Sequence, residues 1–281
     1  MKKQLSNEER LQTDRAWSRL RDRLERDGLM DESNQRKNPS FRYAVAFAAT
    51  LVLLVTAGLL FTNREKEGPS ILSMELLNDV AGTTLVSRLE DGSIVYLTEN
   101  SSIKHPQKFS SEERKIELEG EAFFDIARDE KKPFIINAGN TEAMVLGTSF
   151  ELINHDGETV LSVKTGKVRL TLISSGVTID VSAGERAYSD NSQLKKLTFD
   201  EYENFKKYRL KMHFKDQSLE SIAIVLNRNF DDREIVVDPD IANRELTATF
   251  TGENQESMVK LICNALNLKY SNEGKIIKIH L

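Results

Sequence analysis

The residues that most often carry enzyme chemistry are not arranged for it in this sequence. The four histidines, His105, His155, His213 and His280, are scattered, and none has the spacing of a metal-binding motif such as H-E-x-x-H. The single cysteine, Cys263, lies in an apolar helical pattern and has no second cysteine to pair with. The sequence contains no glycine-rich phosphate loop and no nucleophile elbow. It therefore predicts a protein that is not an enzyme and has no catalytic residue, metal site or cofactor.

Two acidic residues, Glu119 and Glu121, have a spacing that would allow paired carboxylates. Residues two apart in a β-strand point to the same face, so these side chains would be neighbours. Exposed strand faces carry such pairs routinely, and we interpret this pair as solvated surface charge. The remaining function class is binding, and the residues that could bind a partner depend on how the segments of the chain are arranged.

An uncharged apolar stretch from Tyr43 to Phe61 divides the chain. About nineteen helical residues span roughly 28 Å, close to the hydrocarbon thickness of a bilayer, and a single spanning segment must be helical. Lysine and arginine are denser before the stretch than after it, which places the N-terminus in the cytoplasm. The alternatives are a signal peptide and a buried core helix, but some forty residues precede the stretch and it has no polar face. We expect a single-pass protein of the bacterial inner membrane with a periplasmic C-terminus.

The composition limits the class of partner. The net charge of -5 argues against direct binding of nucleic acid, which requires a basic surface. A single cysteine allows no intramolecular disulfide, so the part outside the membrane must be held together by packing. This cysteine usage is typical of a periplasmic protein rather than of a small extracellular domain.

The segment before the membrane, residues 1–42, contains one predicted helix that begins near Asn7 and ends before Gly28. It is too short to form a core of its own, so we expect it to fold against a protein partner. The apolar contacts would come from Trp17, Leu20 and Leu24, and the charged contacts from Arg15, Arg21 and Arg23. The alternatives are a solvated helix and a helix that lies on the inner leaflet of the membrane.

After a spacer at 62–71, residues 72–190 have the periodicity of strands. In Lys115–Asp125, apolar residues alternate with charged ones, and the row of apolar residues includes Gly120, where we expect a bend. Two alternating runs around Ser174-Ser175-Gly176 predict a β-hairpin. Many short strands with few helical patterns indicate an all-β domain, either a sandwich or a solenoid-like fold.

The remaining residues predict a linker helix at 191–208 and a small α+β domain at 209–281. The domain contains a near-repeat with an offset of about thirty-six residues, in which a strand ending at Phe214 or Phe250 is followed by an amphipathic helix. We expect the second helix to bury Met258, Leu261, Ile262, Ala265 and Leu266. Later strands complete two βαβ-like units.

A series of motifs follows in order within residues 91–185: Asp91-Gly92-Ser93, Glu119-Gly120-Glu121-Ala122-Phe123-Phe124-Asp125-Ile126, Lys132-Pro133-Phe134-Ile135, Val145-Leu146-Gly147-Thr148-Ser149-Phe150, Gly166-Lys167-Val168 and Ala183-Gly184-Glu185. Together these motifs resemble the periplasmic domain of the FecR family, the transmembrane anti-sigma regulators, in the form common in Bacteroidetes. We interpret their residues as structural, the glycines serving turns or close approaches of the backbone and the phenylalanines serving the core. Residues 209–281 resemble the small domain that follows in these regulators, and the short N-terminal domain of secretins and of signalling TonB-dependent receptors.

The resemblance implies a function. The cytoplasmic segment would sequester an extracytoplasmic-function sigma factor, and the periplasmic domains would recognise the signalling domain of a loaded TonB-dependent outer-membrane receptor. Release would follow regulated proteolysis, first by a periplasmic protease and then by an intramembrane protease. Thr56, Ala57 and Gly58 interrupt the leucine-rich helix and are the candidate site of the second cut. The alternative from a different class is a structural envelope protein that binds a secretin or cell-wall glycan.

Overall fold

The structure is a computed structural model that describes residues 7–28, 73–190, 192–198, 202–252 and 254–281. The chain divides into two compact units, Met1–Glu67 and Gly68–Leu281, and each is treated by itself. The predicted membrane span at 43–61, its candidate cleavage site at Thr56, Ala57 and Gly58, and the spacer at 62–71 lie outside the described residues. No helix of the described ranges is long and apolar enough to cross a membrane.

In the first unit the described residues form one helix, α1 (Asn7–Arg26), as the sequence predicted. The helix ends because Gly28 adopts a φ of 64°, a conformation that suits glycine at a helix C-terminus. The Asp27 N–H donates to Arg23 O at 2.9 Å in this last turn. The helix has arginines in its final turn, where the negative end of the helix dipole favours cations.

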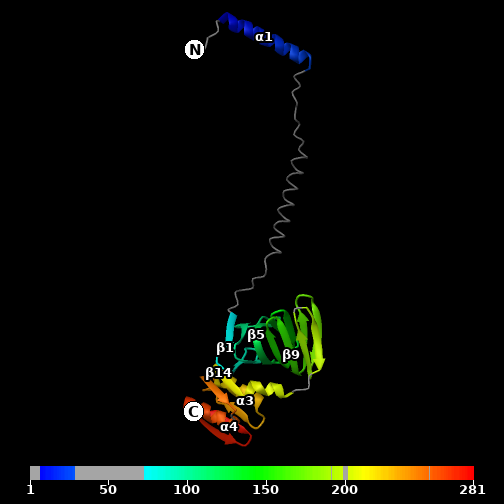
Figure 1. Ribbon diagram of the computed structural model, residues 1–281. Coiled ribbons are helices and arrows are strands. Elements are labelled where there is room, and N and C mark those ends of the chain that lie inside the picture. The colour runs from blue at the N-terminus through cyan, green and yellow to red at the C-terminus, as the bar shows by residue number, and fades with distance from the viewer. Residues whose placement is uncertain (1–6, 29–72, 191, 199–201, 253) are drawn as a thin grey trace. The chain divides into compact units, whose positions relative to one another are not determined.

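In the second unit, strands between Ser73 and Thr198 form two sheets that enclose one apolar core (Figure 1). The first sheet has the order β1 (Ser73–Asn78), β4 (Ser101–Pro106), β5 (Arg114–Asp125), β6 (Phe134–Ala138), β7 (Thr141–Val145), β10 (Lys167–Leu172), β11 (Val177–Ser182). The second begins with β2 (Thr84–Arg88), β3 (Ile94–Leu97) and β5, and continues with β8 (Ser149–His155), β9 (Glu158–Thr165), β12 (Glu185–Ser189) and β13 (Leu194–Thr198).

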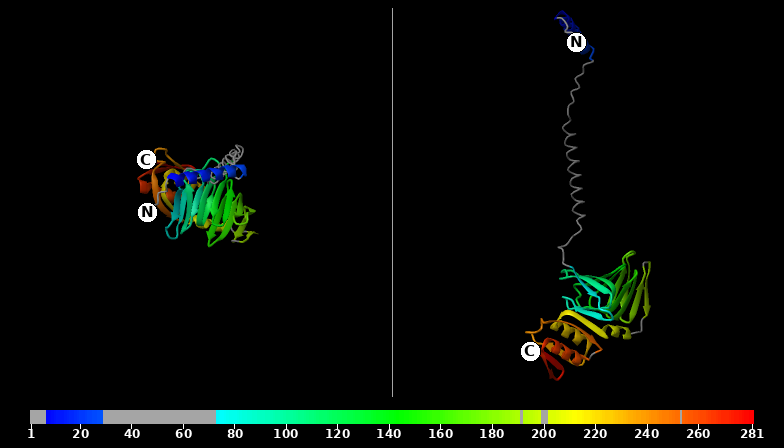
Figure 2. Two further views of the ribbon diagram at one scale, coloured as in Figure 1. Left: turned by 90° about the horizontal axis from the view of Figure 1, so that it is seen from above. Right: turned by 60° about the vertical axis from the view of Figure 1, so that its left-hand side comes forward.

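Successive hairpins alternate between these two sheets. The hairpins β6–β7 and β10–β11 belong to the first sheet, and β8–β9 and β12–β13 belong to the second. Figure 2 shows how the strands follow one another side by side from the cyan to the yellow-green part of the chain. The domain is therefore a sandwich built by solenoid-like addition of hairpins, and it has features of both predicted folds.

Strand β5 joins the two sheets because it bends at Gly120. Residues up to Glu119 pair with β4 and β6, whereas residues from Gly120 onward pair with β3 and β8. Gly120 has a φ of 90°, and a Cβ atom there would lie 2.9 Å from the Cα atom of Ser101. Only glycine fits such an approach. Burial alternates along the strand as predicted, with Ile116 and Leu118 inside and Lys115 and Glu117 outside.

The predicted linker helix at 191–208 was wrong over its first half. Residues Leu194–Thr198 form β13, which pairs antiparallel with β12. The hairpin forms because the Asp190 carboxylate accepts the backbone N–H groups of Ser192 and Gln193 at 2.8 and 2.9 Å and so fixes the turn. A 3-10 helix, η1 (Tyr202–Arg209), follows.

The C-terminal module consists of β14 (Lys211–Ser218), α3 (Leu219–Asn229), β15 (Glu234–Val237), β16 (Glu245–Thr251), α4 (Gln255–Leu266), β17 (Lys269–Glu273) and β18 (Ile276–His280). Its near-repeat extends to the helix caps. Ser218 accepts the N–H of Ser221, and Asn254, thirty-six positions later, accepts the N–H of Ser257.

Two expectations for this module were wrong. The strands of each βαβ-like unit do not share a sheet: β14 pairs with β16, and β15 pairs with β18, which also pairs with β17. Each of these sheets therefore contains strands from both copies of the near-repeat. In α4, Leu261 is 47% exposed and Ala265 is exposed, because Val259 and Cys263 turn toward the core in their place.

The sandwich and the C-terminal module, predicted as separate domains, form one body. Strand β14 pairs in parallel with β2 and so continues the second sheet. A second apolar core combines Tyr96 and Phe123 of the sandwich with Phe205, Tyr208 and residues of the C-terminal module. Phe123 is central to it, since its ring lies 5.5 Å from Tyr208 and 5.4 Å from Phe205, centroid to centroid.

Candidate interaction surfaces

Helix α1 exposes the apolar side chains that the sequence assigned to a partner. Trp17 is 64% exposed and Leu20 is 45% exposed, while Leu24 is half-buried. At about 100° per residue, Leu20 and Leu24 lie within roughly 60° of Trp17 around the helix axis. The three therefore share one face, and an exposed tryptophan is the residue type that most often anchors a protein interface.

The arginines of α1 do not share that face equally. Arg21 lies roughly 40° from Trp17, whereas Arg15 and Arg19 lie roughly 160° away, and Arg23 lies roughly 120° away. All four are exposed. A partner that contacts both Trp17 and Arg15 must therefore extend around the helix, whereas Arg21 is accessible from the apolar side.

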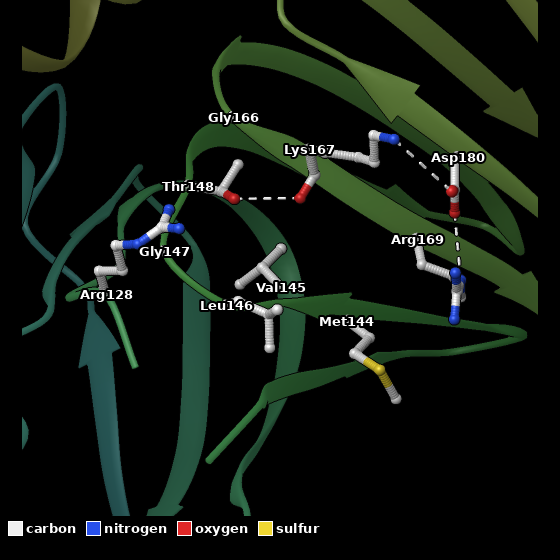
Figure 3. A pocket seen from close by; sticks show the side chains of 10 residues that line it. All are labelled: Arg128, Met144, Val145, Leu146, Gly147, Thr148, Gly166, Lys167, Arg169 and Asp180. Carbon is white, nitrogen blue, oxygen red and sulfur yellow. Dashed lines mark hydrogen bonds and ion pairs between the residues drawn. The ribbon is translucent and has the colours of Figure 1, made fainter. Parts of the chain in front are cut away.

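A cavity of about 350 Å³ opens where three FecR-like motif residues, Gly147, Thr148 and Gly166, come together (Figure 3). Met144, Val145 and Leu146 line its apolar part, and Arg128, Lys167, Arg169 and Asp180 line the rest. Arg169 donates to Asp180 Oδ1 at 3.1 Å, and Lys167 Nζ lies 3.9 Å from Asp180 Oδ2. Arg128 pairs with Glu130. Each cation of the lining thus lies beside an acid.

The glycines of this region have packing roles. A Cβ atom on Gly147 would lie 2.6 Å from the Cα atom of Arg128, so only glycine at this position allows the loop after β5 to pack so closely. One on Gly166 would lie 2.9 Å from the hydroxyl of Thr148, which itself donates to Lys167 O at 3.0 Å. These motif residues hold the β7–β8 and β9–β10 connections together.

A buried ion pair fixes the turn before β3. Arg114 at the start of β5 is 1% exposed, and its guanidinium lies 2.8 Å from the carboxylate of Asp91. It also donates to Lys132 O and Ala127 O at 2.9 and 2.8 Å. The motif Asp91-Gly92-Ser93 is therefore structural: Asp91 neutralises a buried charge and also accepts the Ser93 N–H at 3.0 Å.

A second polar cluster joins the sandwich to η1. The Tyr208 hydroxyl lies 2.8 Å from Glu121 Oε1 and 2.7 Å from Glu151 Oε1, and donates to this pair of carboxylates. Lys207 Nζ lies 2.7 and 2.9 Å from the same two oxygens. Burial and the two negative charges raise the pKa of Tyr208 far above its ordinary value. Burial alone would lower the pKa of Lys207, but its hydrogen bonds to Glu121 and Glu151 outweigh burial and raise it.

The C-terminal module has a groove between α3 and β15, with a volume of about 490 Å³. Its lining includes Ala223 and Ile224 from the helix and Val236 from the strand, with two acids, Glu220 and Glu234. No strand of the described chain pairs with the outer side of β15. The groove is thus bounded by a helix on one side and a sheet edge on the other.

Two family models match the chain over these parts. The model described as FecR protein matches residues 80–169, and the model described as FecR, C-terminal, matches residues 211–279. The chain belongs to the FecR family. The resemblance of its motifs to these anti-sigma regulators is thereby confirmed.

Two crystal structures of a candidate anti-sigma factor from Parabacteroides distasonis ATCC 8503 are similar to this FecR-family chain. One is 26% identical, covers 74% of this chain and 99% of its own, and gives a TM-score of 0.46. The other is 25% identical, covers 74% of this chain and 98% of its own, and gives a TM-score of 0.45. No curated protein matches the chain.

The FecR motif residues lie at structural positions. Phe124, Phe134 and Phe150 are fully buried, and Phe124 stacks on Phe150 with ring centroids 5.3 Å apart. Pro133 contributes its carbonyl, which accepts the Arg114 N–H at 2.8 Å, and Gly184 has a φ of 79° in the turn before β12. In the described residues, no three His, Cys, Asp or Glu side chains are grouped so that they could hold a metal ion.

Sequence reasoning missed several residues of the FecR-family body. The carboxylate that pairs with Glu121 is Glu151 of β8, and Glu119 points to solvent instead. A lone acid between Phe150 and Leu152, within the otherwise apolar run from Phe150 to Ile153, was the available signal. Arg114 had no comparable signal, since a charged residue that opens a strand is ordinary.

Proposed function

We propose that this FecR-family protein is an anti-sigma factor that binds an extracytoplasmic-function sigma factor through α1. The observation that carries the proposal is the face of α1 formed by Trp17, Leu20 and Leu24, two of whose side chains are exposed. The helix belongs to a unit too small to bury this face, and the family supplies the class of partner. Arg21, next to Trp17, would pair with an acidic group of the sigma factor, and Arg15 and Arg23 would contact a partner that extends around the helix.

The test is the affinity of the full-length chain, in detergent micelles, for the extracytoplasmic-function sigma factor of the same genome. Trp17→Ala removes the anchor, and we expect binding about thirty-fold weaker, equivalent to about 2 kcal/mol. Arg19→Ala, on the opposite side of the helix, is the matched control and should change the affinity less than about threefold. Equal losses in the two variants, or no binding by the unchanged protein, would refute the assignment.

We also propose that residues 43–61 cross the inner membrane, with residues 1–42 in the cytoplasm and the sandwich and C-terminal module in the periplasm. The support is the uncharged apolar stretch and the excess of basic residues before it. Reporter fusions at the two ends test this topology. Cytoplasmic activity at both ends, or at neither, would be incompatible with a single crossing in this direction.

The periplasmic body would recognise the signalling domain of a substrate-loaded TonB-dependent receptor. A single membrane helix conducts small shape changes poorly, so we propose that regulated proteolysis releases the sigma factor. Periplasmic cleavage would come first, followed by an intramembrane cut near Thr56, Ala57 and Gly58. Immunoblots of the protein at successive times during induction of the target genes test whether it is cleaved. Full induction of target genes while the full-length protein persists unchanged would exclude proteolysis as the release mechanism.

A further inference from the structure

A side chain of α3 closes part of the outer edge of β15. Asn227 Nδ2 donates to Ile235 O at 2.9 Å, and the Ile235 N–H donates to Asn227 Oδ1 at 2.8 Å. One residue that gives its N–H and its C=O to the same neighbour is the pattern of an antiparallel strand pair. The Asn227 carboxamide therefore occupies the place of a neighbouring strand.

The direction of the backbone groups shows how much of the edge remains. The N–H of Glu234 donates to Lys275 O at 2.8 Å, and that of Asp238 donates to Ile279 O at 3.0 Å, both toward β18. Because these groups alternate along a strand, those of Ile235 and Val237 point to the opposite side. Asn227 therefore occupies the outward N–H and C=O of Ile235, whereas the outward groups of Val237 form the next pairing position along the edge.

The groove next to this edge is negatively charged. It runs along α3 and is lined by small or apolar residues, Ala223, Ile224, Val236 and Ala242 among them. Glu220 and Glu234 are its two charged residues, and its lining among the described residues contains no lysine or arginine. An extended segment with basic side chains complements this surface, since its backbone fits the edge and its cations meet the acids.

We propose that the α3–β15 groove binds one extended, basic segment of a protein partner, which pairs with the outer edge of β15 and displaces the Asn227 carboxamide. The proposal rests on the proposed function only in taking the C-terminal module to be a part that meets a periplasmic protein. Asn227 is then a positioning residue that keeps the edge closed until the partner arrives. An uncapped edge would instead invite pairing with any exposed strand.

A purely local role for Asn227 makes a different prediction. Asn227 and Ile235 are only eight positions apart, so the two hydrogen bonds also fix the reversal of the chain between α3 and β15. If that were the whole role, replacing Asn227 would lower stability and leave binding unchanged. If the carboxamide competes with a partner, replacing it must strengthen binding.

The experiment measures binding of two nine-residue peptides to the full-length chain in detergent micelles by fluorescence anisotropy. One peptide alternates lysine and valine, and its matched control alternates glutamate and valine. We expect the lysine peptide alone to bind, and to bind Asn227→Ala about tenfold more tightly, because two hydrogen bonds no longer have to be displaced. Val237→Pro should abolish binding, since proline removes the outward N–H but no bond to β18.

Two alanine-to-tryptophan variants complete the test. Ala242→Trp fills the groove and should abolish binding, whereas Ala265→Trp, on the exposed side of α4, should leave it unchanged. This pair keeps the test decisive if Val237→Pro does not fold, as judged by circular dichroism. The proposal is overturned by equal binding of the two peptides, by binding that survives Ala242→Trp, or by an unchanged affinity in Asn227→Ala. Absence of binding to Asn227→Ala at about 1 mM peptide overturns it as well. Sigma-factor binding by α1 does not involve these positions, so either proposal can fail alone.

Discussion

Replacing Asp91 by alanine should destabilise the sandwich severely, although the residue lies in a turn. The change leaves the guanidinium of Arg114 without its anion, at a site where that side chain is only 2% exposed. Breaking a buried pair by removal of one partner typically costs 3–5 kcal/mol, because the other charge stays desolvated. The hydrogen bonds that the Asp91 carboxylate accepts from the backbone N–H and the hydroxyl of Ser93, at 3.0 and 2.7 Å, are lost as well.

For a unit of this size, each kcal/mol lowers the melting temperature by about 2–4 °C, so we expect a fall of roughly 6–20 °C. Differential scanning calorimetry of the full-length protein in micelles measures it. The matched control is Asp180→Ala, which breaks exposed ion pairs with Lys167 and Arg169 and should cost less than about 1 kcal/mol. Similar losses in the two variants would refute the reasoning.

A double variant separates the stranded charge from the lost contacts. Arg114→Met together with Asp91→Ala removes both charges and keeps an apolar side chain of similar length. Because no buried charge remains, we expect the double variant to be more stable than Asp91→Ala alone. If it is less stable, the cost lies in the turn rather than in the uncompensated guanidinium.

Three further predictions concern single positions. Gly147→Ala should cost more than about 2 kcal/mol in urea unfolding, whereas Gly184→Ala, which has no atom within 4 Å of a Cβ, should cost about 1 kcal/mol from its positive φ alone. The raised pKa values of Tyr208 and Lys207 stabilise the folded state below the unfolded values, near pH 10, and this contribution is lost as the pH rises further. Urea midpoints should therefore fall between pH 9 and pH 11, and fall less in Tyr208→Phe; an equal fall would contradict the assignment. Trp17→Phe should bind the sigma factor more tightly than Trp17→Ala does, because a smaller aromatic anchor remains.

Local patterns predicted much of the sandwich. The alternation in Lys115–Asp125, the bend at Gly120 and the hairpin around Gly176 each depend on a few neighbouring residues, and each is present in the structure. The helices of the near-repeat and their order also followed from spacing alone. These features depend on contacts that are close in sequence or on the chemistry of one residue.

Pairing between distant strands could not be predicted in the same way. The parallel contact of β14 with β2 joins residues more than a hundred positions apart, and nothing in either strand specifies the other. The same holds for Tyr208, which contacts Glu121 and Glu151 from outside the sandwich. The exposure of Leu261 could not be predicted for the same reason. The face that α4 buries is decided by the neighbouring elements rather than by the pattern of its own residues.

The shared second core has a consequence for how such chains diversify. Val86, Ile94, Tyr96 and Phe123 belong to the first matched region, yet they share this core with Phe205 and Tyr208 of η1 and with side chains of the second matched region. If recombination exchanged only one of the two regions, these four apolar side chains would be exposed to water or would pack against residues of a different shape. Shuffling between relatives should therefore preserve the two regions as one heritable block, and new specificities would arise by substitution on its outer surfaces.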